Sequence, residues 1–570
     1  MHLSVIPTNL RSVLKKVPRI DVVILTTLVV CVIAIFHPLL QNKLLVSDDY
    51  EHHAARLANY FLALKQGQIL PRWAPNLNDG FGYPVFNYTY HTPYVVGSTF
   101  HALGFPIEQS VNLTVLASLV SASLGIYLTG RMAKMKSWDS LILSLFYVVN
   151  PYILLTVFWR GAVGELYAYA CIPFVLATTM TGNTRSSETS QRLLLFSQVI
   201  LLSILILSHI PFAAFAILSI IGWLFLQSNS RKKLMQFLIS LLLSILLTGW
   251  YWIPAQFEQS FTTYSAGTSL SQYATQFTIA LDLLKVWRTS LSSEYFLQTL
   301  QLGFVPIIAI SAAVIILFVK RNSGKHVATW YWIAVILGSI MIMDPISKPI
   351  WDILYPLQIL QYPWRLLAIV NIASILIIIS IYKEISAKAR FFIISLVFLS
   401  VCLAIFGYAR IKGVANHSDN YWYQSAETGT SFDENRPLWF ITPMVEIPPI
   451  IFLEDPSIPE QTFLPPENLT IDTFDGSNIT YSVNATASGY LIHHRAYFPG
   501  WEVVVDGEFV PIQYQLNLFR GLIAFPVSAG EHEVAIRFSS TTPARQIGVG
   551  LSVVGVLLLL WIIAMKKPTK

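Results

Sequence analysis

The feature that most limits what this chain can fold into is a series of long apolar runs that recur along the sequence. Each run has about 17–20 residues, close to the length that a helix needs to cross the hydrocarbon core of a bilayer. Apolar residues make up 54% of the 570 residues and charged residues only 12%, which exceeds what a water-soluble core of this size requires. Backbone polar groups find no water inside a bilayer, and the runs lack the alternation of barrel strands, so each run is predicted to be a helix.

We therefore expect an α-helical polytopic membrane protein with about 12 transmembrane helices. The predicted spans cover residues 22–40, 111–130, 140–158, 166–180, 193–209, 212–227, 234–253, 303–319, 327–343, 365–382, 391–408 and 547–565.

The basic residues predict the orientation of these spans. With twelve crossings, every Lys and Arg cluster falls on the same side of the membrane, and the positive-inside rule makes that side the cytoplasm. We expect both termini to be cytoplasmic and the protein to lie in the plasma membrane. A nucleic-acid partner is not expected, because its site would need basic residues on one face with interleaved aromatic residues. The clusters lie within residues 11–19, 131–136, 185–192, 231–233, 320–325, 383–390 and 566–570.

Three regions are expected from this pattern. Residues 1–408 form a multi-spanning membrane domain whose first extracytoplasmic loop, residues 41–110, is long. Residues 409–545 form an extracytoplasmic β-rich domain, and residues 546–570 form the final transmembrane helix and a cytoplasmic tail.

The β-rich region has the sequence of a small antiparallel β-sandwich. Residues 501–505 alternate in hydrophobicity, Asp506-Gly507 is a strong two-residue hairpin turn, and residues 532–538 alternate again. The adjacent residues His493 and His494 would face opposite sides of a strand, which disfavours a metal site with His532. We expect this domain to bind or position an acceptor and not to contain the catalytic centre.

The first outer loop contains the densest group of reactive side chains. Residues 49–66 are predicted to form a helix on which Asp49, His53 and Arg56 share one face and Asp48 lies on the next. The functional interpretation is an active site, with Asp49 as a general base or metal ligand, His53 as its partner and Arg56 binding an anionic group. The alternative, slightly favoured by composition alone, is a solvated amphipathic helix beside the membrane.

Other candidate residues lie on the same side of the membrane as Asp49. Arg160 and Glu165 are at the outer ends of the third and fourth spans, and Gln361 and Arg365 are at the start of the tenth. Ionisable residues at helix ends commonly extend to the interface, which is one interpretation of the two arginines. The sharper hypothesis is a basic, aromatic-lined cavity for a lipid-linked phosphate. It requires Asp49, Arg160 and Arg365 to meet at one cavity.

These motifs also carry a family resemblance. Together they resemble the membrane proteins called 6-pyruvoyl-tetrahydropterin synthase-related, which look like members of the GT-C class of polytopic glycosyltransferases. The region of Tyr497 to Trp501 with Asp506-Gly507 is similar to the outer β-domain of bacterial proteins in that class. The chain lacks the three-histidine zinc set and catalytic cysteine of the soluble pterin synthase, so pterin synthesis is not expected. The motifs are Asp49-x3-His53-x2-Arg56, Gly67, Pro71-Arg72-Trp73, Gly80-x-Gly-Tyr-Pro84, Arg160-Gly-x3-Glu165 and Gln361-x-Pro-Trp-Arg365.

The resemblance implies an enzyme that takes a sugar from a polyprenyl-phosphate carrier and passes it to a glycan, lipid or protein acceptor outside the cytoplasm. It implies that a carboxylate in the first outer loop is the base or metal ligand, and this carboxylate maps onto Asp49, with Asp48 as the alternative. Whether a divalent cation takes part stays open, because the chain has no clear second acidic pair. The candidate catalytic residues are Asp49, Asp48 and His53, and the candidate substrate-binding residues are Arg56, Arg72, Arg160, Glu165, Gln361 and Arg365.

Two non-enzymatic functions compete with this hypothesis. A transporter or flippase of a lipid-linked glycan would carry ionisable residues near the bilayer midplane and repeated halves with broken helices. The predicted spans are nearly free of midplane charge and show no convincing repeat, which disfavours transport. An envelope assembly scaffold would leave the Asp49 face dispensable.

Overall fold

The computed structural model describes most of the chain. The described residues are 19–181, 188–227, 231–266, 272–285, 296–319, 326–430, 433–441, 448–454, 468–539 and 541–564. The basic positions expected at 11–16, 185, 320–325 and 566–570 lie outside them.

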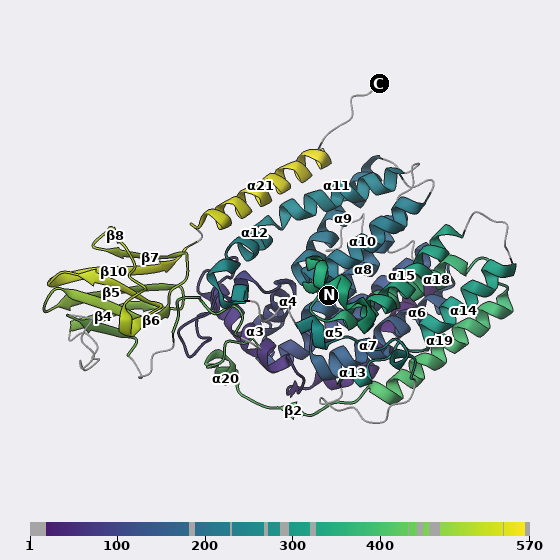
Figure 1. The fold of residues 1–570 in the computed structure, drawn as a ribbon, viewed down its shortest axis with the longest axis horizontal. Helices are drawn as coiled ribbons and strands as arrows, with labels where there is room; N and C mark the ends of the chain where they lie inside the picture. The colour runs from purple at the N-terminus through teal and green to yellow at the C-terminus, as the bar shows by residue number, and fades with distance from the viewer. Residues whose placement is uncertain are drawn as a thin grey trace, which may run out of the picture.

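A bundle of apolar helices forms the body of the molecule, and a small β-domain projects from one end of it (Figure 1). Every predicted span coincides with a helix or with a bent pair of helices. The helices of the bundle are α2 (Arg19–Ile35), α5 (Ile107–Met132), α6 (Ser137–Val148), α7 (Pro151–Leu155), α8 (Val163–Thr181), α9 (Glu188–Ser208), α10 (Ile210–Leu226), α11 (Arg231–Leu247), α12 (Gly249–Phe257), α14 (Phe304–Val319), α15 (Val327–Met343), α18 (Leu367–Ile381), α19 (Ala387–Tyr408) and α21 (Pro543–Ala564).

Among the described residues, six helices are long and apolar enough to cross a membrane, or nine if each of three bent pairs is one span. Three further apolar helices are shorter: 20–35, 210–226 and 304–319. The predicted number of about twelve crossings stays a prediction. The apolar faces do point outward: Phe225, Phe318 and Phe406 are 74%, 84% and 72% exposed, as expected for side chains that a bilayer covers.

Two predicted spans are broken, by 45° between α6 and α7 and by 65° between α11 and α12, and a third break, of 81°, follows the end of the predicted span at α15. Pro151 and Pro345 begin the segments that follow two of these breaks, where the missing N–H and the fixed φ of proline interrupt a helix. After α7 the chain makes a π-helical turn, Thr156–Arg160. Such turns are frequent at functional sites, and this one ends at a candidate site residue.

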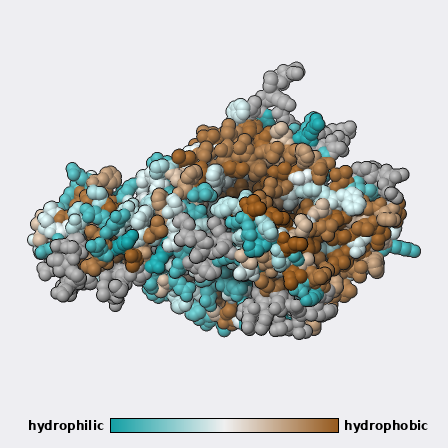
Figure 2. All heavy atoms as spheres, in the orientation of Figure 1, coloured by the Kyte–Doolittle hydropathy of each residue, from teal (hydrophilic) through white to brown (hydrophobic). Residues whose placement is uncertain are grey.

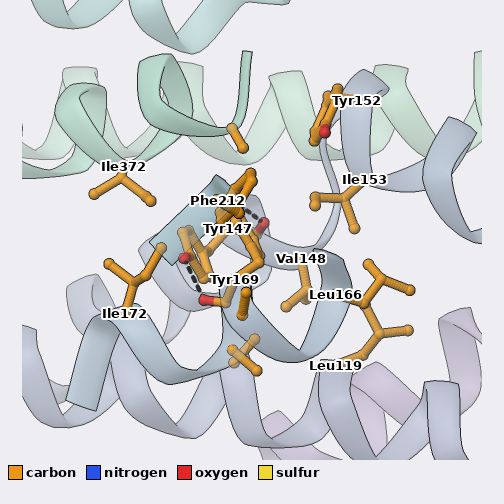
Figure 3. Close-up of a cluster of buried hydrophobic side chains, with 14 of the residues drawn as sticks. Leu119, Tyr147, Val148, Tyr152, Ile153, Leu166, Tyr169, Ile172, Phe212 and Ile372 are labelled. Atoms are coloured by element: carbon orange, nitrogen blue, oxygen red, sulfur yellow. Dashed lines mark hydrogen bonds between the residues drawn. The ribbon is translucent and has the colours of Figure 1, made fainter. Parts of the chain in front are cut away.

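The centre of the bundle is held by two tyrosines that bridge α6 and α8 (Figure 3). The rings of Tyr147 and Tyr169 stack at 3.9 Å, and each hydroxyl donates to the other residue's backbone carbonyl, at 2.8 and 2.9 Å. Buried hydroxyls need such partners, because an unpaired one in an apolar core costs free energy.

Short helices cover the outer end of the bundle. The first outer loop forms α3 (Tyr50–Lys65) and α4 (Thr92–Ala102). A two-stranded ladder, β1 (Leu44–Leu45) with β2 (Val414–Ala415), ties this loop to the chain that follows α19. The remaining short helices are α13 (Phe296–Thr299), α16 (Lys348–Ile353), α17 (Tyr355–Gln358) and α20 (Asp419–Tyr423).

The β-domain is the predicted antiparallel sandwich. One sheet has the strand order β4-β5-β10-β7-β8, and the other has the order β3-β6-β9. Asp506 and Gly507, both at positive φ, form the turn between β7 and β8 that the sequence predicts. The strands are β3 (Ile450–Leu453), β4 (Asn468–Phe474), β5 (Asn478–Ala485), β6 (Gly489–Ala496), β7 (Trp501–Val505), β8 (Glu508–Val510), β9 (Leu522–Val527) and β10 (Gly530–Phe538).

The surface separates into two zones along the length of the molecule. Apolar residues cover the bundle around α11 and α21, whereas the β-domain and the adjoining outer loop are largely hydrophilic (Figure 2). The boundary between the zones lies near the outer ends of the helices, where the first outer loop packs.

Candidate active site

A cavity of about 1120 Å³ opens at the end of the bundle where residues 41–110 pack, and its wall contains most of the residues that the sequence singles out. Asp49, Arg160 and Arg365 all line it, so the convergence that the lipid-phosphate hypothesis requires is present. The further predicted residues in its wall are Asp48, His53, Arg56, Glu165 and Gln361.

Backbone pairing places Asp49 beside Arg160. The Asp48 and Asp49 N–H groups donate to the carbonyls of Trp159 and Arg160, both at 2.9 Å. Gly161 permits this approach, because its φ is +77° and a Cβ there would lie 2.3 Å from Ser47 Oγ. The Arg160-Gly pair in the sequence is thus a positional requirement of the site.

The Asp49 carboxylate faces the cavity without a hydrogen bond or ion pair to any described residue. Burial raises the pKa of Asp49, and the positive charges of Arg160 and Arg56 act against that rise. Asp48 differs: its carboxylate is 52% exposed and pairs with Lys412 at 2.6 Å. Asp49 is therefore the better placed of the two to accept a proton.

His53 does not pair with Asp49 as the sequence hypothesis proposes. It is buried, and its ring nitrogens contact the hydroxyls of Tyr94 at 2.8 Å and Tyr90 at 3.3 Å. Burial lowers the pKa of His53 well below its ordinary value, so the ring is neutral and positions the two tyrosines. Both Tyr90 and His53 line the cavity.

Arg56, one turn further along α3, reaches the segment that follows α20. Its Nε donates to the carbonyl of Gly429 at 2.5 Å, and Glu434 of the same segment lies within electrostatic range. This contact ties the first outer loop to the chain that leads into the β-domain.

The strongest electrostatic feature of the cavity is a cluster of two arginines around one carboxylate. Arg160 forms a two-pronged pair with Glu165, at 2.9 and 3.0 Å, and Arg365 Nε contacts Glu165 Oε1 at 2.5 Å. The Tyr152 hydroxyl donates to Glu165 at 2.9 Å. Only 6% of Arg160 and 8% of Arg365 are exposed, so neither residue extends to the interface. One carboxylate serves two guanidinium groups, which leaves the cluster with a net positive charge.

Aromatic rings flank both arginines. Arg160 lies over the Trp364 ring at 4.3 Å and Arg365 over the Tyr362 ring at 4.5 Å, and the two rings stack on each other. Gln361, at a φ of +62°, accepts from Arg365 Nη1 at 3.1 Å. The predicted basic, aromatic-lined wall is thus built by residues 361–365 together with Arg160.

Arg72 is the predicted substrate-binding residue that the structure does not bring to this cavity. Its guanidinium donates to Asn87 Oδ1 and to the Trp250 carbonyl, both at 2.7 Å. These bonds hold the first outer loop against α12. Its role is therefore to support the loop that carries the site.

An apolar wall extends from the charged cluster along α10 and α11. The sequence predicts these segments only as spans, because apolar side chains in a span carry no signal that separates a ligand groove from a lipid-facing surface. The wall consists of Ile210, Pro211, Ala213, Ala214, Ile217, Leu218 and Ile221 from α10, and Leu241 and Ile245 from α11.

Sequence reasoning also missed several polar residues of the cavity. His209 lies between α9 and α10, and Glu434 precedes the β-domain. The His209-Ile-Pro211 interruption between two apolar runs was a signal for the first. No comparable signal marks Glu434, because long-range packing brings it to the cavity.

The candidate ligands of a divalent cation are sparse. Within the described residues, no group of three His, Cys, Asp or Glu side chains could hold a metal ion. In the β-domain, His493 bonds Tyr481, His494 contacts the carbonyl of Asp79, and His532 pairs with Asp506. The three histidines therefore make three separate contacts and do not converge on one point.

These features define a polytopic membrane protein with a β-domain at one end and a cavity lined by ionic side chains in its helical bundle. The family model described as the 6-pyruvoyl-tetrahydropterin synthase related domain, a membrane protein, matches residues 86–411, more than half of the chain. The chain belongs to this family, as its motifs predict. The matched region includes Arg160, Glu165, Gln361 and Arg365. A comparison with curated proteins gave no match.

Several solved structures are similar to this one at low identity. The arabinofuranosyltransferase AftD from Mycobacteria is 16% identical, with a TM-score of 0.45 over 70% of this chain and 28% of that one. The Archaeoglobus fulgidus oligosaccharyltransferase is 10% identical, with a TM-score of 0.46 over 75% of this chain and 62% of that one. ArnT from Cupriavidus metallidurans is 12% identical, with a TM-score of 0.30 over 63% and 77% of the respective chains. This chain thus spans less than a third of the first protein's length and less than two thirds of the second's.

Proposed function

We propose that this protein is a membrane glycosyltransferase that moves a sugar from a polyprenyl-phosphate carrier to an acceptor outside the cytoplasm. The observation that carries the proposal is one cavity that combines a carboxylate with no partner among the described residues, a positively charged cluster and an apolar wall. Each of the three matches one part of such a reaction.

The apolar wall suits the hydrocarbon chain of the carrier. It runs along α10 and α11, whose outer faces are exposed at Phe225 and Leu242, by 74% and 59%. A prenyl chain in this groove would bury apolar surface on the protein while staying next to the bilayer.

The cluster of Arg160, Arg365 and Glu165 suits the phosphate. Arginine binds phosphate oxygens through its planar fork of donors. Glu165 holds both guanidinium groups in place and still leaves a net positive charge for an anion. Their burial strengthens that attraction, because a low-dielectric site screens charge less than water does.

Asp49 suits the proton transfer. An acceptor hydroxyl attacks the anomeric carbon of the sugar, the bond between that carbon and the phosphate oxygen breaks, and its electron pair stays on the departing polyprenyl phosphate. Asp49 takes the hydroxyl proton as the glycosidic bond forms. Arg160 and Arg365 stabilise the charge that develops on the phosphate.

The β-domain and the outer chain before it would then position the acceptor. The Arg56 contact with Gly429 and the presence of Glu434 in the cavity wall support this assignment, since both connect the site with the segment that leads to the β-domain. We propose the plasma membrane as the location, with both termini cytoplasmic and the cavity facing outward.

Replacing Asp49 by Asn tests the proposal. The change keeps the side-chain size but removes the basicity, and loss of a general base lowers rates by about 10²–10⁴-fold. The matched control is Asp48→Asn, because Asp48 pairs with Lys412 instead of facing the cluster alone. The assay follows release of polyprenyl phosphate from polyprenyl-phosphate-linked sugars in membranes that contain equal amounts of each protein.

Loss of transfer in Asp49→Asn alone is the expected result. Full activity of Asp49→Asn would overturn the assignment of the base. If the wild-type protein moves a lipid-linked sugar across the membrane of vesicles without cleaving it, the protein is a transporter and not a transferase.

A further inference from the structure

His209 occupies a distinctive position between α9 and α10. It is the N-terminal cap of α10: its Nδ1 accepts a hydrogen bond from the Phe212 N–H at 3.2 Å. A neutral imidazole whose Nδ1 accepts a bond carries its proton on Nε2. The cap therefore fixes the tautomer and leaves Nε2–H as a donor.

That donor opens into the cavity. His209 is partly buried and lines the cavity wall, and its Nε2 has no partner among the described residues. Its ring lies 6.2 Å from that of Tyr90, and it is within electrostatic range of Arg365, Glu165 and Arg160. The residue thus stands where the apolar wall of α10 meets the charged cluster.

We propose that the His209 Nε2–H group donates a hydrogen bond to the phosphate of the lipid-linked substrate, so that His209 helps the cavity to select a phosphorylated lipid. The inference rests on the proposed function, because it assumes that the cavity takes a lipid phosphate. It adds a residue that neither the motifs nor the charge pattern of the sequence assigns to binding.

The negative charge on the lipid phosphate increases during the proposed reaction, and His209 is placed to stabilise it. A phosphodiester between sugar and lipid carries one negative charge, and the departing lipid phosphate carries two once the bond to the sugar breaks. The two arginines with Glu165 supply a net positive charge for the first. A fixed neutral donor beside the arginines stabilises the second negative charge of the phosphate and does not repel the arginines. Such preorganised donors act most strongly on charge that develops during the reaction.

A purely structural role is the competing explanation, since His209 also caps α10. Two substitutions separate the roles. His209→Asn keeps the cap, because Asn is among the best N-cap residues, but its side chain is too short to present an N–H where Nε2 lies. His209→Gln can extend an amide N–H into the cavity but caps poorly.

The experiment measures the affinity of purified full-length protein for farnesyl phosphate and for farnesol, together with the unfolding midpoint of each variant. We expect the wild-type protein to prefer the phosphate, His209→Asn to lose about tenfold of that preference at an unchanged midpoint, and His209→Gln to recover part of it. An unchanged preference in His209→Asn would overturn the role of His209 and leave it as a cap.

The proposed function fails in a different way. If the wild-type protein binds farnesyl phosphate no better than farnesol, the cavity does not select a lipid phosphate. That result would overturn both the proposed function and the role of His209. A lowered midpoint in His209→Asn together with an equal loss of affinity for both lipids would assign His209 to the fold alone.

Discussion

Arg545 and Glu258 form a buried ion pair across 287 residues of sequence, with Arg545 Nη2 2.9 Å from Glu258 Oε2 and side chains that are 0% and 2% exposed. Arg545 also donates to the carbonyls of Pro499 and Ser539 in the β-domain, at 2.8 and 2.7 Å. Glu258 accepts from Asn87 Nδ2 at 2.8 Å. One pair thus joins the end of α12, the start of α21, the β-domain and the first outer loop.

Breaking this pair should loosen the β-domain from the bundle. Arg545→Gln leaves the Glu258 carboxylate buried without its charged partner, which costs about 3–5 kcal/mol for pairs of this kind. We expect a lower unfolding midpoint in detergent and faster proteolysis between α21 and the β-domain. Lys348→Gln is the control, because its pair with Asp352 is exposed on both sides. Equal stability of the two variants would show that the buried pair does not hold the domains together.

The pair of His532 and the exposed Asp506 should make the stability of the β7–β8 hairpin depend on pH. Its hydrogen bond, at 2.7 Å, lowers the pKa of Asp506 below 3.8 and raises the pKa of His532 above 6.5. The raised histidine contributes stability that is full below pH 6.5 and is lost as pH rises through its folded pKa. The lowered carboxyl contributes stability that is full above pH 3.8 and is lost as pH falls through its folded pKa.

The pair is therefore strongest between about pH 4 and 6.5. Hydrogen exchange of residues 503–510 in the full chain, corrected for intrinsic rates, should show more protection at pH 5.5 than at pH 8. Asp506→Asn should abolish that difference. A difference that persists in Asp506→Asn would assign it to another group.

The orientation of the chain can be tested by labelling single cysteines. Ser418→Cys lies before α20, on the side predicted to be outside, and Thr569→Cys lies in the predicted cytoplasmic tail. With intact cells, a membrane-impermeant thiol reagent should label the first and not the second. Labelling of both cysteines from outside would contradict the twelve-span topology and, with it, the proposed outward orientation of the cavity.

The sequence predicted the membrane helices well because each depends on a local run of apolar residues. It also predicted the hairpin at Asp506-Gly507, since the turn chemistry is local. It placed Asp49, His53 and Arg56 on one helical face, but their partners are distant: two tyrosines for His53 and Gly429 for Arg56. Periodicity predicts which way a side chain points and not what it meets there.

Tertiary packing determines which of the other candidate residues reach the cavity. Arg72 belongs to a site motif, yet it bonds Asn87 and the Trp250 carbonyl away from the cavity. Arg160, Glu165 and Arg365 are brought together by the bend that follows α6 and by the short segment before α18. The breaks at Pro151 and Gly249 lie inside apolar runs, where composition alone predicts unbroken spans.

Gly161 links the shape of the backbone to the chemistry of Asp49. Its φ is +77°, and a Cβ would lie 2.3 Å from Ser47 Oγ and 2.8 Å from Tyr50 Cδ1. In Gly161→Ala the side chains of Ser47 and Tyr50 must move, and we expect this to shift residues 47–50 away from Arg160. A misplacement of about 1 Å at an active site can cost about 10²-fold in rate, so we expect a loss of that order in kcat.

Gly67→Ala is the matched control for backbone strain. Gly67 has a similar φ of +86°, but a Cβ there would meet nothing within 4 Å. Both variants incur the strain of an L-residue in the left-handed region, about 1–2 kcal/mol. Gly161→Ala also carries the cost of its clash with Ser47 and Tyr50, so it should unfold at the lower temperature. Only Gly161→Ala also moves Asp49. Sugar transfer should therefore fall in Gly161→Ala and persist in Gly67→Ala, and equal activity of the two would mean that the spacing between Asp49 and Arg160 does not limit the reaction.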